Sequence, residues 1–193
     1  MTSNLNKTVK ISLLAGMAFI LMYIEIPLIP IFPWLKMDLS DVPAIMGAFA
    51  FGPLAGVIIE LIKVLMHFLL AGSGTGGVGE VANFIIGASF VLPAALLYSR
   101  NKSKKTAILG MVIGVLVMEV VGIIANVYFL LPAYGMHMDS AQLMQYVTVG
   151  LLPFNAIKGI IVSVATYALY KKVSVSIFKC DSNFGEKRKE KVA

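Results

Sequence analysis

The chain has 193 residues, of which 59% are hydrophobic and only 13% are charged. Soluble domains are typically ~45–50% apolar and ~25% charged, so this composition excludes an ordinary soluble globular protein. The formal net charge of +6 does not indicate nucleic-acid binding, because the basic residues lie mainly in loops and tails, as the positive-inside rule for membrane proteins predicts.

Six apolar segments predict an all-α integral membrane protein with a single six-helix domain over residues 1–172. In chain order, the predicted spans cover about residues 9–31, 41–51, 54–70, 78–98, 106–131 and 146–170. The first span is expected to end at Pro27, Pro30 and Pro33, and Asp41 is expected to cap the second. The second span is too short to cross a bilayer alone. Residues 173–193 are expected to form a charged cytoplasmic tail.

The first apolar run is longer than the apolar part of a signal peptide, so we expect it to remain as a membrane helix. The single cysteine, Cys180, excludes an intrachain disulfide and a cysteine metal cluster.

The distribution of Lys and Arg predicts the orientation in the membrane. With six spans, 13 of the 16 basic residues precede the first span, connect the fourth to the fifth, or follow the sixth. These three regions lie on one face of the membrane, which the positive-inside rule makes cytoplasmic. Five or seven spans would divide the basic residues between both faces. We therefore predict that both termini are cytoplasmic.

Polar residues within the spans gather in the outer half of the membrane in this topology. These polar residues are Lys63, His67, Glu80, Asn83, Glu119, Asn126, Asn155 and Lys158. Ionisable residues inside a membrane are costly and usually functional. Their uneven distribution favours a pocket that opens outward over a continuous channel.

Helical spacing places several of these residues on shared faces. Asn155 and Lys158 are three residues apart, and Glu60, Lys63 and His67 also share one face. Amides and an ammonium group suit a planar ligand rich in carbonyls and ring nitrogens. Aromatic walls are expected from the following residues: Phe32, Trp34, Phe84, Tyr128 and Phe154.

Structural roles compete with binding roles at several positions. Glu60 and Lys63 are equally well explained as an ion pair between helices, and His67 as a packing residue. Glu119 is a candidate structural partner for Lys63 or Lys158. Trp34 is typical of the aromatic belt at a membrane interface.

The glycine-rich stretch at 74–79 formally matches G-x-G-x-x-G but joins two membrane helices instead of following a strand. It is more consistent with a mobile loop over the pocket. The sequence contains no P-loop motif, zinc motif or recognisable catalytic triad, so we expect a transport protein that is not an enzyme and uses no cofactor.

Several separated motifs carry a family resemblance over about residues 9–172. They are DLSDVPAIMGAFAFGPLAGVIIELIKVLMHFLL, GEVANF, NVYFLLPAY and LLPFNAIKGI. They resemble the riboflavin-specific substrate-binding subunits of energy-coupling factor vitamin transporters. The resemblance implies a six-helix subunit of the bacterial plasma membrane that binds riboflavin at its extracellular side. It also implies a transmembrane coupling subunit and two cytoplasmic ATPases as partners, which hydrolyse the ATP.

The resemblance also implies roles for particular residues. Asn126, Asn155 and Lys158 are expected to contact the flavin ring, with Glu80 and Asn83 as further candidates. The loop around Lys36, Met37, Asp38, Leu39 and Ser40 is similar to the family's ligand-covering loop. The family often docks on its coupling subunit through an Ala-xxx-Ala pattern in the first span. This chain has Ser12 and Gly16 at that spacing, and small residues still allow close helix approach.

Other functions remain open at this point. The same architecture could carry another vitamin, such as thiamine or pantothenate. An ion-coupled transporter that uses Glu60, Glu119 or Lys63 as a proton relay is a second alternative, although the chain lacks the internal repeats common in that class. An intramembrane enzyme is a third.

Overall fold

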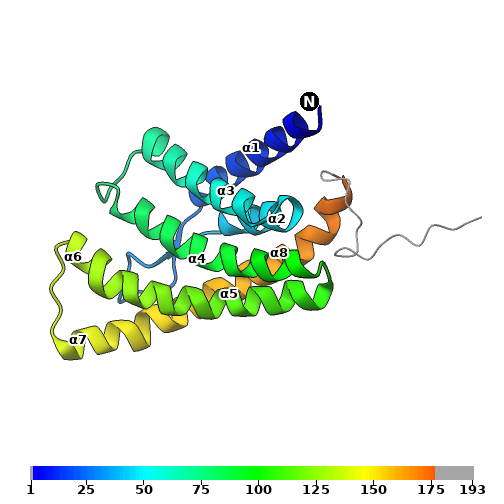
Figure 1. Ribbon diagram of the computed structural model, residues 1–193. Coiled ribbons are helices and arrows are strands. Elements are labelled where there is room, and N and C mark those ends of the chain that lie inside the picture. Colours follow the sequence, from blue (N-terminus) through cyan, green and yellow to red (C-terminus); the bar gives the residue numbers. More distant parts are fainter. Residues whose placement is uncertain (1, 177–193) are drawn as a thin grey trace, which may run out of the picture.

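The computed structural model describes residues 2–176, and this part of the chain is mainly helical (Figure 1). The elements are, in order, α1 (Thr2–Met22), β1 (Ile26–Pro27), β2 (Lys36–Met37), α2 (Asp41–Phe51), α3 (Pro53–Met66), η1 (His67–Ala71), α4 (Val78–Arg100), α5 (Lys104–Ala125), η2 (Asn126–Leu130), α6 (Leu131–Ala133), α7 (Ser140–Gln145), η3 (Tyr146–Leu151) and α8 (Leu152–Ser176). The segments η1, η2 and η3 are π-helical. Most of the expected tail lies outside the described residues.

Six helical stretches form the membrane domain, as expected for this fold class. Five are long and apolar enough to cross a bilayer: 5–22, 53–71, 78–100, 104–133 and 140–170. The sixth, α2, has 11 residues, nine of which are buried among the other helices. A short helix is tolerated at membrane depth when its neighbours surround it.

The first helix is shorter than expected. α1 ends at Met22, and residues 23–40 form an extended loop that contains the two-stranded ribbon of β1 and β2, paired at Ile26–Met37 and Pro27–Lys36. The prediction that this span reaches residue 31 was wrong. Proline lacks a backbone N–H and disfavours helical backbone in the residue before it, so Pro27, Pro30 and Pro33 keep the segment extended.

The chain turns sharply between α2 and α3. Gly52 adopts a φ of 102°, which residues with a side chain rarely reach, and Pro53 occupies the first turn of α3. This break folds α2 back against α3, so that the polar residues of the two helices can meet in the interior.

Small residues bring α4 and α5 into close contact. A Cβ at Gly110 would lie 2.6 Å from the carbonyl oxygen of Ala94, and one at Gly114 would lie 2.6 Å from that of Phe90. Glycines four residues apart are a common way to pack membrane helices closely. Because the backbones nearly touch, α5 is held in a fixed register along α4.

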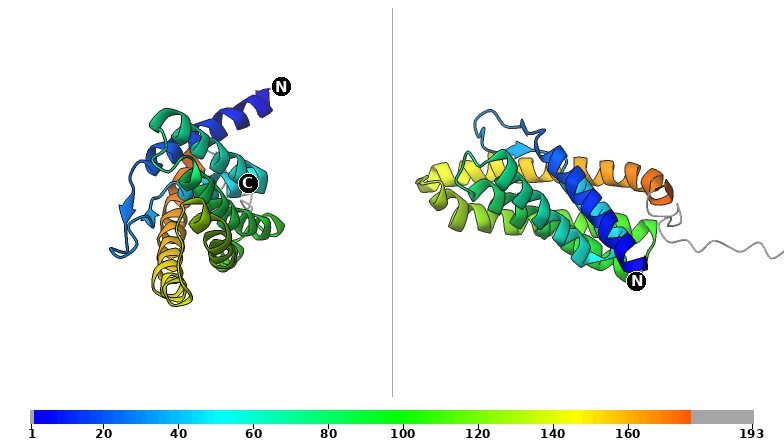
Figure 2. Two further views of the ribbon diagram at one scale, coloured as in Figure 1. Left: turned by 90° about the vertical axis from the view of Figure 1, so that its left-hand side faces the viewer. Right: turned by 90° about the horizontal axis from the view of Figure 1, so that it is seen from above.

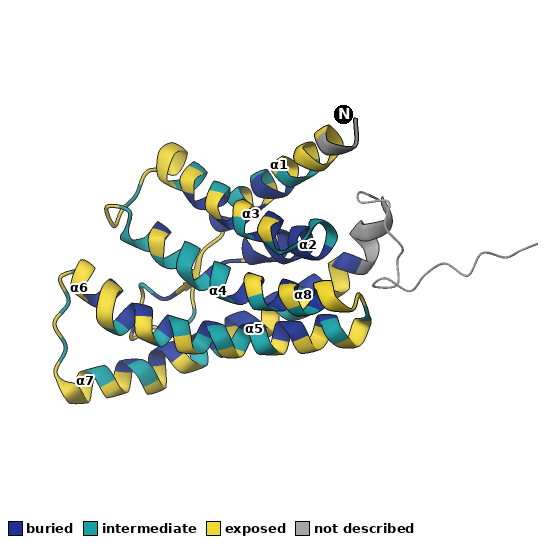
Figure 3. Ribbon diagram, viewed as in Figure 1, coloured by how far each residue is buried: buried dark blue, intermediate teal, exposed yellow. Residues whose placement is uncertain are grey.

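The outer surface of the bundle is apolar. Large hydrophobic residues on the long helices, such as Leu54, Leu116 and Val164, are more than 60% exposed, while Figure 3 shows α2 largely buried. Such a surface suits lipid and would be poorly tolerated in water. The chain is therefore a multi-pass membrane protein.

The two ends of the bundle carry different connections. The N-terminal end of α1, the connection from α4 to α5 and the C-terminal end of α8 lie at one end (Figures 1 and 2). The ribbon loop and the connections from α3 to α4 and from α6 to α7 lie toward the other end. The basic residues at the start of α1 and in the connection from α4 to α5, including Lys7, Lys10 and Lys102, belong to the first end, whereas Lys36 lies in the ribbon loop.

Candidate ligand-binding site

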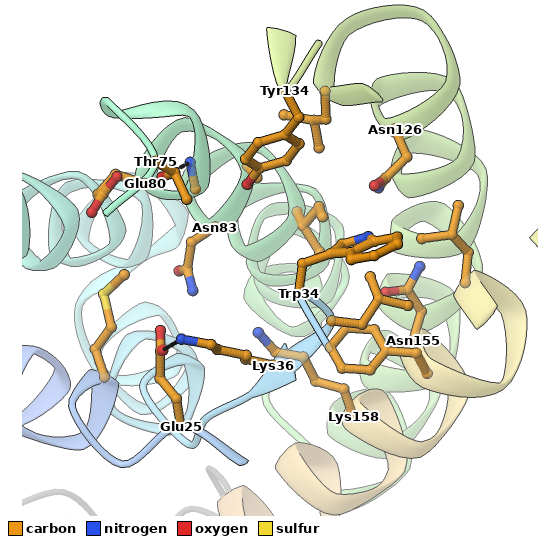
Figure 4. Close-up of a pocket in the computed structure, with 18 of the residues that line it drawn as sticks. Glu25, Trp34, Lys36, Thr75, Glu80, Asn83, Asn126, Tyr134, Asn155 and Lys158 are labelled. Carbon is orange, nitrogen blue, oxygen red and sulfur yellow. Dashed lines mark hydrogen bonds and ion pairs between the residues drawn. The ribbon is translucent and has the colours of Figure 1, made fainter. Parts of the chain in front are cut away.

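A cavity of about 250 Å³ opens between the ribbon loop and the helices at the end away from the termini (Figure 4). Small-molecule pockets are typically ~300–1,000 Å³, so this cavity suits one compact ligand. Its polar and aromatic lining residues are Glu25, Trp34, Lys36, His67, Thr75, Glu80, Asn83, Asn126, Tyr134, Phe154, Asn155 and Lys158. Six of the predicted binding residues are in this set: Lys36, Glu80, Asn83, Asn126, Asn155 and Lys158.

Three π-helical segments begin at residues around this end of the bundle. η1 begins at His67, η2 at Asn126 and η3 at Tyr146. A π-helical turn widens the helix locally and re-aims its side chains, and such turns are frequent at functional sites. Two of the three first residues, His67 and Asn126, line the cavity directly.

Asn126 is held by hydrogen bonds at both ends of its amide. Its Oδ1 accepts from the Tyr146 hydroxyl at 2.8 Å, and its Nδ2 donates to the carbonyl oxygen of Gly122 at 2.8 Å. Trp34 Nε1 in turn donates to the Tyr146 hydroxyl at 3.3 Å. The indole, the phenol and the amide thus form one network that fixes the orientation of Asn126.

Asn155 is fully buried and meets α5 on one side. Its Nδ2 lies 3.4 Å from Glu119 Oε2, and its Oδ1 has no hydrogen-bond partner among the described residues. Gly122 makes room for this amide, since a Cβ there would lie 2.8 Å from Asn155 Nδ2. Glu119 therefore pairs with Asn155, and the suggestion that it pairs with Lys63 or Lys158 was wrong.

Lys158 approaches the cavity from a buried ionic cluster. Its Nζ lies 3.1 Å from Asp41 Oδ2 and 3.7 Å from Asp38 Oδ2. An ammonium group has three donors, and these two carboxylates leave a donor for the cavity, which Lys158 lines. Lys158 is thus a positioned cationic donor at the cavity wall.

Lys63 lies in the same cluster but has a structural role. Its Nζ contacts Asp41 Oδ1 at 2.5 Å, Glu60 Oε2 at 2.7 Å and Ser40 Oγ at 2.7 Å. The ammonium group thus donates to Ser40 and Asp41 and pairs with Glu60, and Lys63 does not line the cavity. The interpretation of Glu60 and Lys63 as a structural ion pair is the one that this geometry supports.

Asp41 belongs to this cluster and is not an N-cap. The residue at the N-cap position is Ser40, and Asp41 is the first residue of α2. The expectation that the Asp41 carboxylate caps the helix was wrong. Two lysine ammonium groups attract the carboxylate more strongly than neutral backbone N–H groups do.

The five residues 36–40, which were predicted to form a loop over the ligand, lie in three different environments. Lys36 lines the cavity and pairs with Glu25 at 2.7 Å. Asp38 and Ser40 are buried in the ionic cluster, where Asp38 also accepts from Asn83 Nδ2 at 3.1 Å. Met37 packs against a second hydrophobic cluster, which includes Phe32 and Leu35, and Leu39 is 36% exposed.

The glycine-rich connection contributes to the opposite wall. Ser73 donates to Glu80 Oε2 at 2.8 Å, and His67 Nδ1 lies 3.0 Å from Glu80 Oε1. Burial and the nearby Glu80 carboxylate raise the pKa of the Tyr134 phenol, which therefore stays neutral. This wall presents hydroxyls and a carboxylate, which suit a ligand that carries hydroxyl groups.

The aromatic walls are only partly as expected. Trp34 and Phe154 line the cavity, while Phe32 lies behind them with its ring 5.6 Å from that of Trp34. Tyr128 is 78% exposed and faces away, and Phe84 does not line the cavity. Trp34 is therefore a pocket residue instead of a member of the interfacial belt.

The candidate docking residues lie on the outer face of α1. Ser12 is exposed, and a Cβ built on Gly16 would have no atom within 4 Å. This part of α1 therefore leaves open space for another helix.

The sequence of this chain is similar to those of known transport proteins. A family model described as "ECF transporter, substrate-specific component" matches residues 6–170. The riboflavin transporter RibU of Staphylococcus aureus is 39% identical over 172 residues, which cover 87% of this chain and 90% of that protein. The riboflavin transporter FmnP of Bacillus subtilis is 38% identical over 173 residues, with 86% and 91% covered.

A solved structure of the S component of a bacterial ECF transporter has the same fold. It aligns with a TM-score of 0.76 and 39% sequence identity, covering 87% of this chain and 95% of that chain.

Proposed function

Because the chain belongs to the family of ECF transporter substrate-specific components, we propose that it captures riboflavin in the cavity between the ribbon loop and α8. It is a transport subunit and not an enzyme, and it resides in the bacterial plasma membrane as a multi-pass protein. The observation that carries the choice of ligand is the pairing of riboflavin-transporting relatives with a cavity whose polar groups match a flavin.

The chemistry of riboflavin supports this match. The flavin ring is flat, with carbonyls, ring nitrogens and one N–H along its polar edge. We assign this edge to Asn126, Asn155 and Lys158, and the stacking surface to Trp34 and Phe154. Riboflavin is a transported substrate in this scheme and not a cofactor.

The ribityl chain has several hydroxyl groups, and the wall around Glu80 suits them. We assign Glu80, Asn83 and Thr75 to this chain. Asn83 Oδ1 is buried and without a hydrogen-bond partner among the described residues, so it is free to accept from a hydroxyl. Asp38 and Ser40 act indirectly in this proposal, since they hold Asn83, Lys158 and Lys63 in place.

We place the cavity at the extracellular face and both termini in the cytoplasm. The charge distribution supports this orientation, because the basic connections lie at the end of the bundle away from the cavity. We further propose that a transmembrane coupling subunit docks on α1 at Ser12 and Gly16, and that separate ATPase subunits drive transport. The open space beside Gly16 supports this position.

The first experiment is to purify the full chain in mild detergent and to titrate it with riboflavin, following flavin fluorescence. We expect quenching to saturate, and we expect the purified protein to show flavin absorbance if ligand is retained. Lys158→Met should weaken binding about ten- to a hundredfold, the range for a lost hydrogen bond to a charged group. Ile157→Ala is the control, since that side chain is 42% exposed on the same helix.

Lys158→Met leaves Asp41 short of one partner, so thermal unfolding should be measured for each variant. Asn155→Ala tests the same wall without removing a charge, and it should weaken binding about tenfold. A folded wild-type protein that neither carries flavin nor quenches added riboflavin would contradict the proposed function. Normal affinity in both variants would contradict the site assignment alone.

A further inference from the structure

Glu119 is an intramembrane carboxyl group for which the proposed function assigns no role. It lies in the middle of the continuous helix Lys104–Ala133, beside Val120, which is 59% exposed toward the membrane. Glu119 itself is partly exposed. A carboxylate in an apolar medium is strongly disfavoured unless a cation or several hydrogen bonds stabilise it.

The described neighbours of Glu119 do not supply a cation. Its one polar contact within residues 2–176 is Asn155, at 3.4 Å. On α8, Lys158 lies one turn from Asn155 but is paired with Asp41 and Asp38. On α4, which packs along α5, the titratable residues lie near the two ends of the helix and are Glu80, Tyr98 and Arg100. In η3, Tyr146 donates to Asn126. The neutral acid is therefore the favoured form of Glu119.

The partner of Glu119 has an amide group whose two ends face different surroundings. Asn155 Nδ2 is turned toward Glu119, whereas Oδ1 is buried without a hydrogen-bond partner among the described residues. Asn155 is fully buried and lines the cavity. The amide oxygen and nitrogen have nearly the same size, so the group can turn over within the space that Gly122 leaves.

The protonation state of Glu119 decides which end of the amide faces the cavity. A carboxylate only accepts hydrogen bonds, so it would hold the Asn155 NH₂ group and leave the carbonyl oxygen toward the ligand. A carboxylic acid has an O–H that donates to the amide oxygen, which satisfies Oδ1 and turns the NH₂ group toward the ligand.

We propose that Glu119 is a positioning residue for the ligand: as a neutral acid, it donates to Asn155 Oδ1 and directs the Asn155 NH₂ group into the cavity. Asn155 and Lys158 are three residues apart on α8, so the two then present adjacent donors. Adjacent donors suit a ligand edge that carries a carbonyl beside an unprotonated ring nitrogen. This inference rests on the proposed function and specifies how one wall recognises the flavin edge.

Riboflavin affinity in three variants tests the positioning role. Glu119→Gln keeps an N–H that can donate to Asn155 Oδ1, so its affinity should stay within about twofold of wild type. Glu119→Leu has a similar volume but no donor, and its affinity should fall about five- to tenfold, as for one lost neutral hydrogen bond. Leu116→Ala is the control, because Leu116 is 61% exposed one turn away on α5.

Infrared difference spectroscopy provides a readout that a purely structural role would not change. A protonated carboxyl group has a carbonyl stretch separate from that of a carboxylate. We expect a protonated carboxyl band that is missing in Glu119→Gln and that shifts when riboflavin is added to the wild type. The shift should disappear in Asn155→Ala, while the band itself should remain.

The outcomes separate this inference from the proposed function. Absence of riboflavin binding in the folded wild type would contradict the proposed function, whereas the infrared band can be measured without ligand. The inference is overturned if no carboxyl band depends on Glu119 or if Glu119→Leu binds riboflavin like the wild type. If Glu119→Leu fails to fold, the infrared spectra of the wild type, Glu119→Gln and Asn155→Ala test the inference instead. It is then overturned if the carboxyl band does not depend on Glu119, or if its ligand-induced shift does not depend on Asn155.

Discussion

The carboxylate of Asp41 lies between two buried lysines, with Oδ2 3.1 Å from Lys158 Nζ and Oδ1 2.5 Å from Lys63 Nζ. One lysine faces the cavity and the other does not. Asp41 therefore links the ligand-binding wall on α8 to the structural ion pair on α3. All three side chains are almost completely buried, so the strength of these pairs depends on each partner being present.

Asp41→Asn should strongly destabilise the protein. Removing one partner of a buried ion pair costs roughly 3–5 kcal/mol, because the remaining charges lose their compensation. We expect a clearly lower unfolding temperature in detergent, measured by circular dichroism. Glu25→Gln is the matched control, because its pair with Lys36 is partly exposed and such pairs contribute only about 0–1 kcal/mol. Equal effects of the two substitutions would contradict the assigned role of Asp41.

Gly122→Ala should weaken riboflavin binding by about tenfold with a smaller effect on folding. The new Cβ would lie 2.8 Å from Asn155 Nδ2, so the Asn155 amide must shift, and a lost hydrogen bond is worth about 1 kcal/mol or slightly more. The measurement is a fluorescence titration with riboflavin. Gly16→Ala should have no effect on binding, since its Cβ would meet no atom within 4 Å. Unchanged affinity in Gly122→Ala would show that Asn155 does not contact the ligand.

Tyr146→Phe should loosen the pocket without changing its shape. The substitution removes the hydroxyl that donates to Asn126 and accepts from Trp34, which leaves a buried amide oxygen unpaired at a cost of about 1–3 kcal/mol. We expect a lower affinity for riboflavin and a modest loss of thermal stability. A variant that matches the wild type in both would exclude this network from ligand binding.

The single tryptophan offers a direct probe of ligand position. Trp34 lines the cavity, and the chain has no other tryptophan. Bound riboflavin should therefore quench most of the intrinsic tryptophan fluorescence at one equivalent of ligand. A saturating flavin signal without any change in tryptophan emission would place the ligand elsewhere.

A bulky residue at Gly16 should separate binding from transport. Gly16→Leu fills the open space on α1 and should prevent docking of the coupling subunit, while riboflavin binding by the isolated chain stays normal. The test is co-purification with the coupling complex and uptake of labelled riboflavin. Leu13→Ala is the matched control, because Leu13 is 59% exposed on α1. Normal uptake by Gly16→Leu would contradict this docking site.

The membrane class, the six helical segments and the choice of the polar residues on α8 follow from the sequence alone. Long apolar runs and the positions of Lys and Arg reflect the bilayer, which acts on each segment separately. Asn155 and Lys158 share a helix face by spacing, so their common position on the cavity wall could be predicted before any tertiary contact was known.

The partners of these residues depended on the tertiary structure. The sequence predicted Asp41 as a helix cap and Glu119 as a partner of a lysine, but the break at Gly52 and the close packing around Gly122 bring Asp41 to both lysines and Glu119 to Asn155. The pairing of Ile26 with Met37 in the ribbon loop and the three π-helical turns were likewise not predicted from the sequence. Local sequence preferences specify which segments are helical, while the pairing of buried charges depends on which helices pack together.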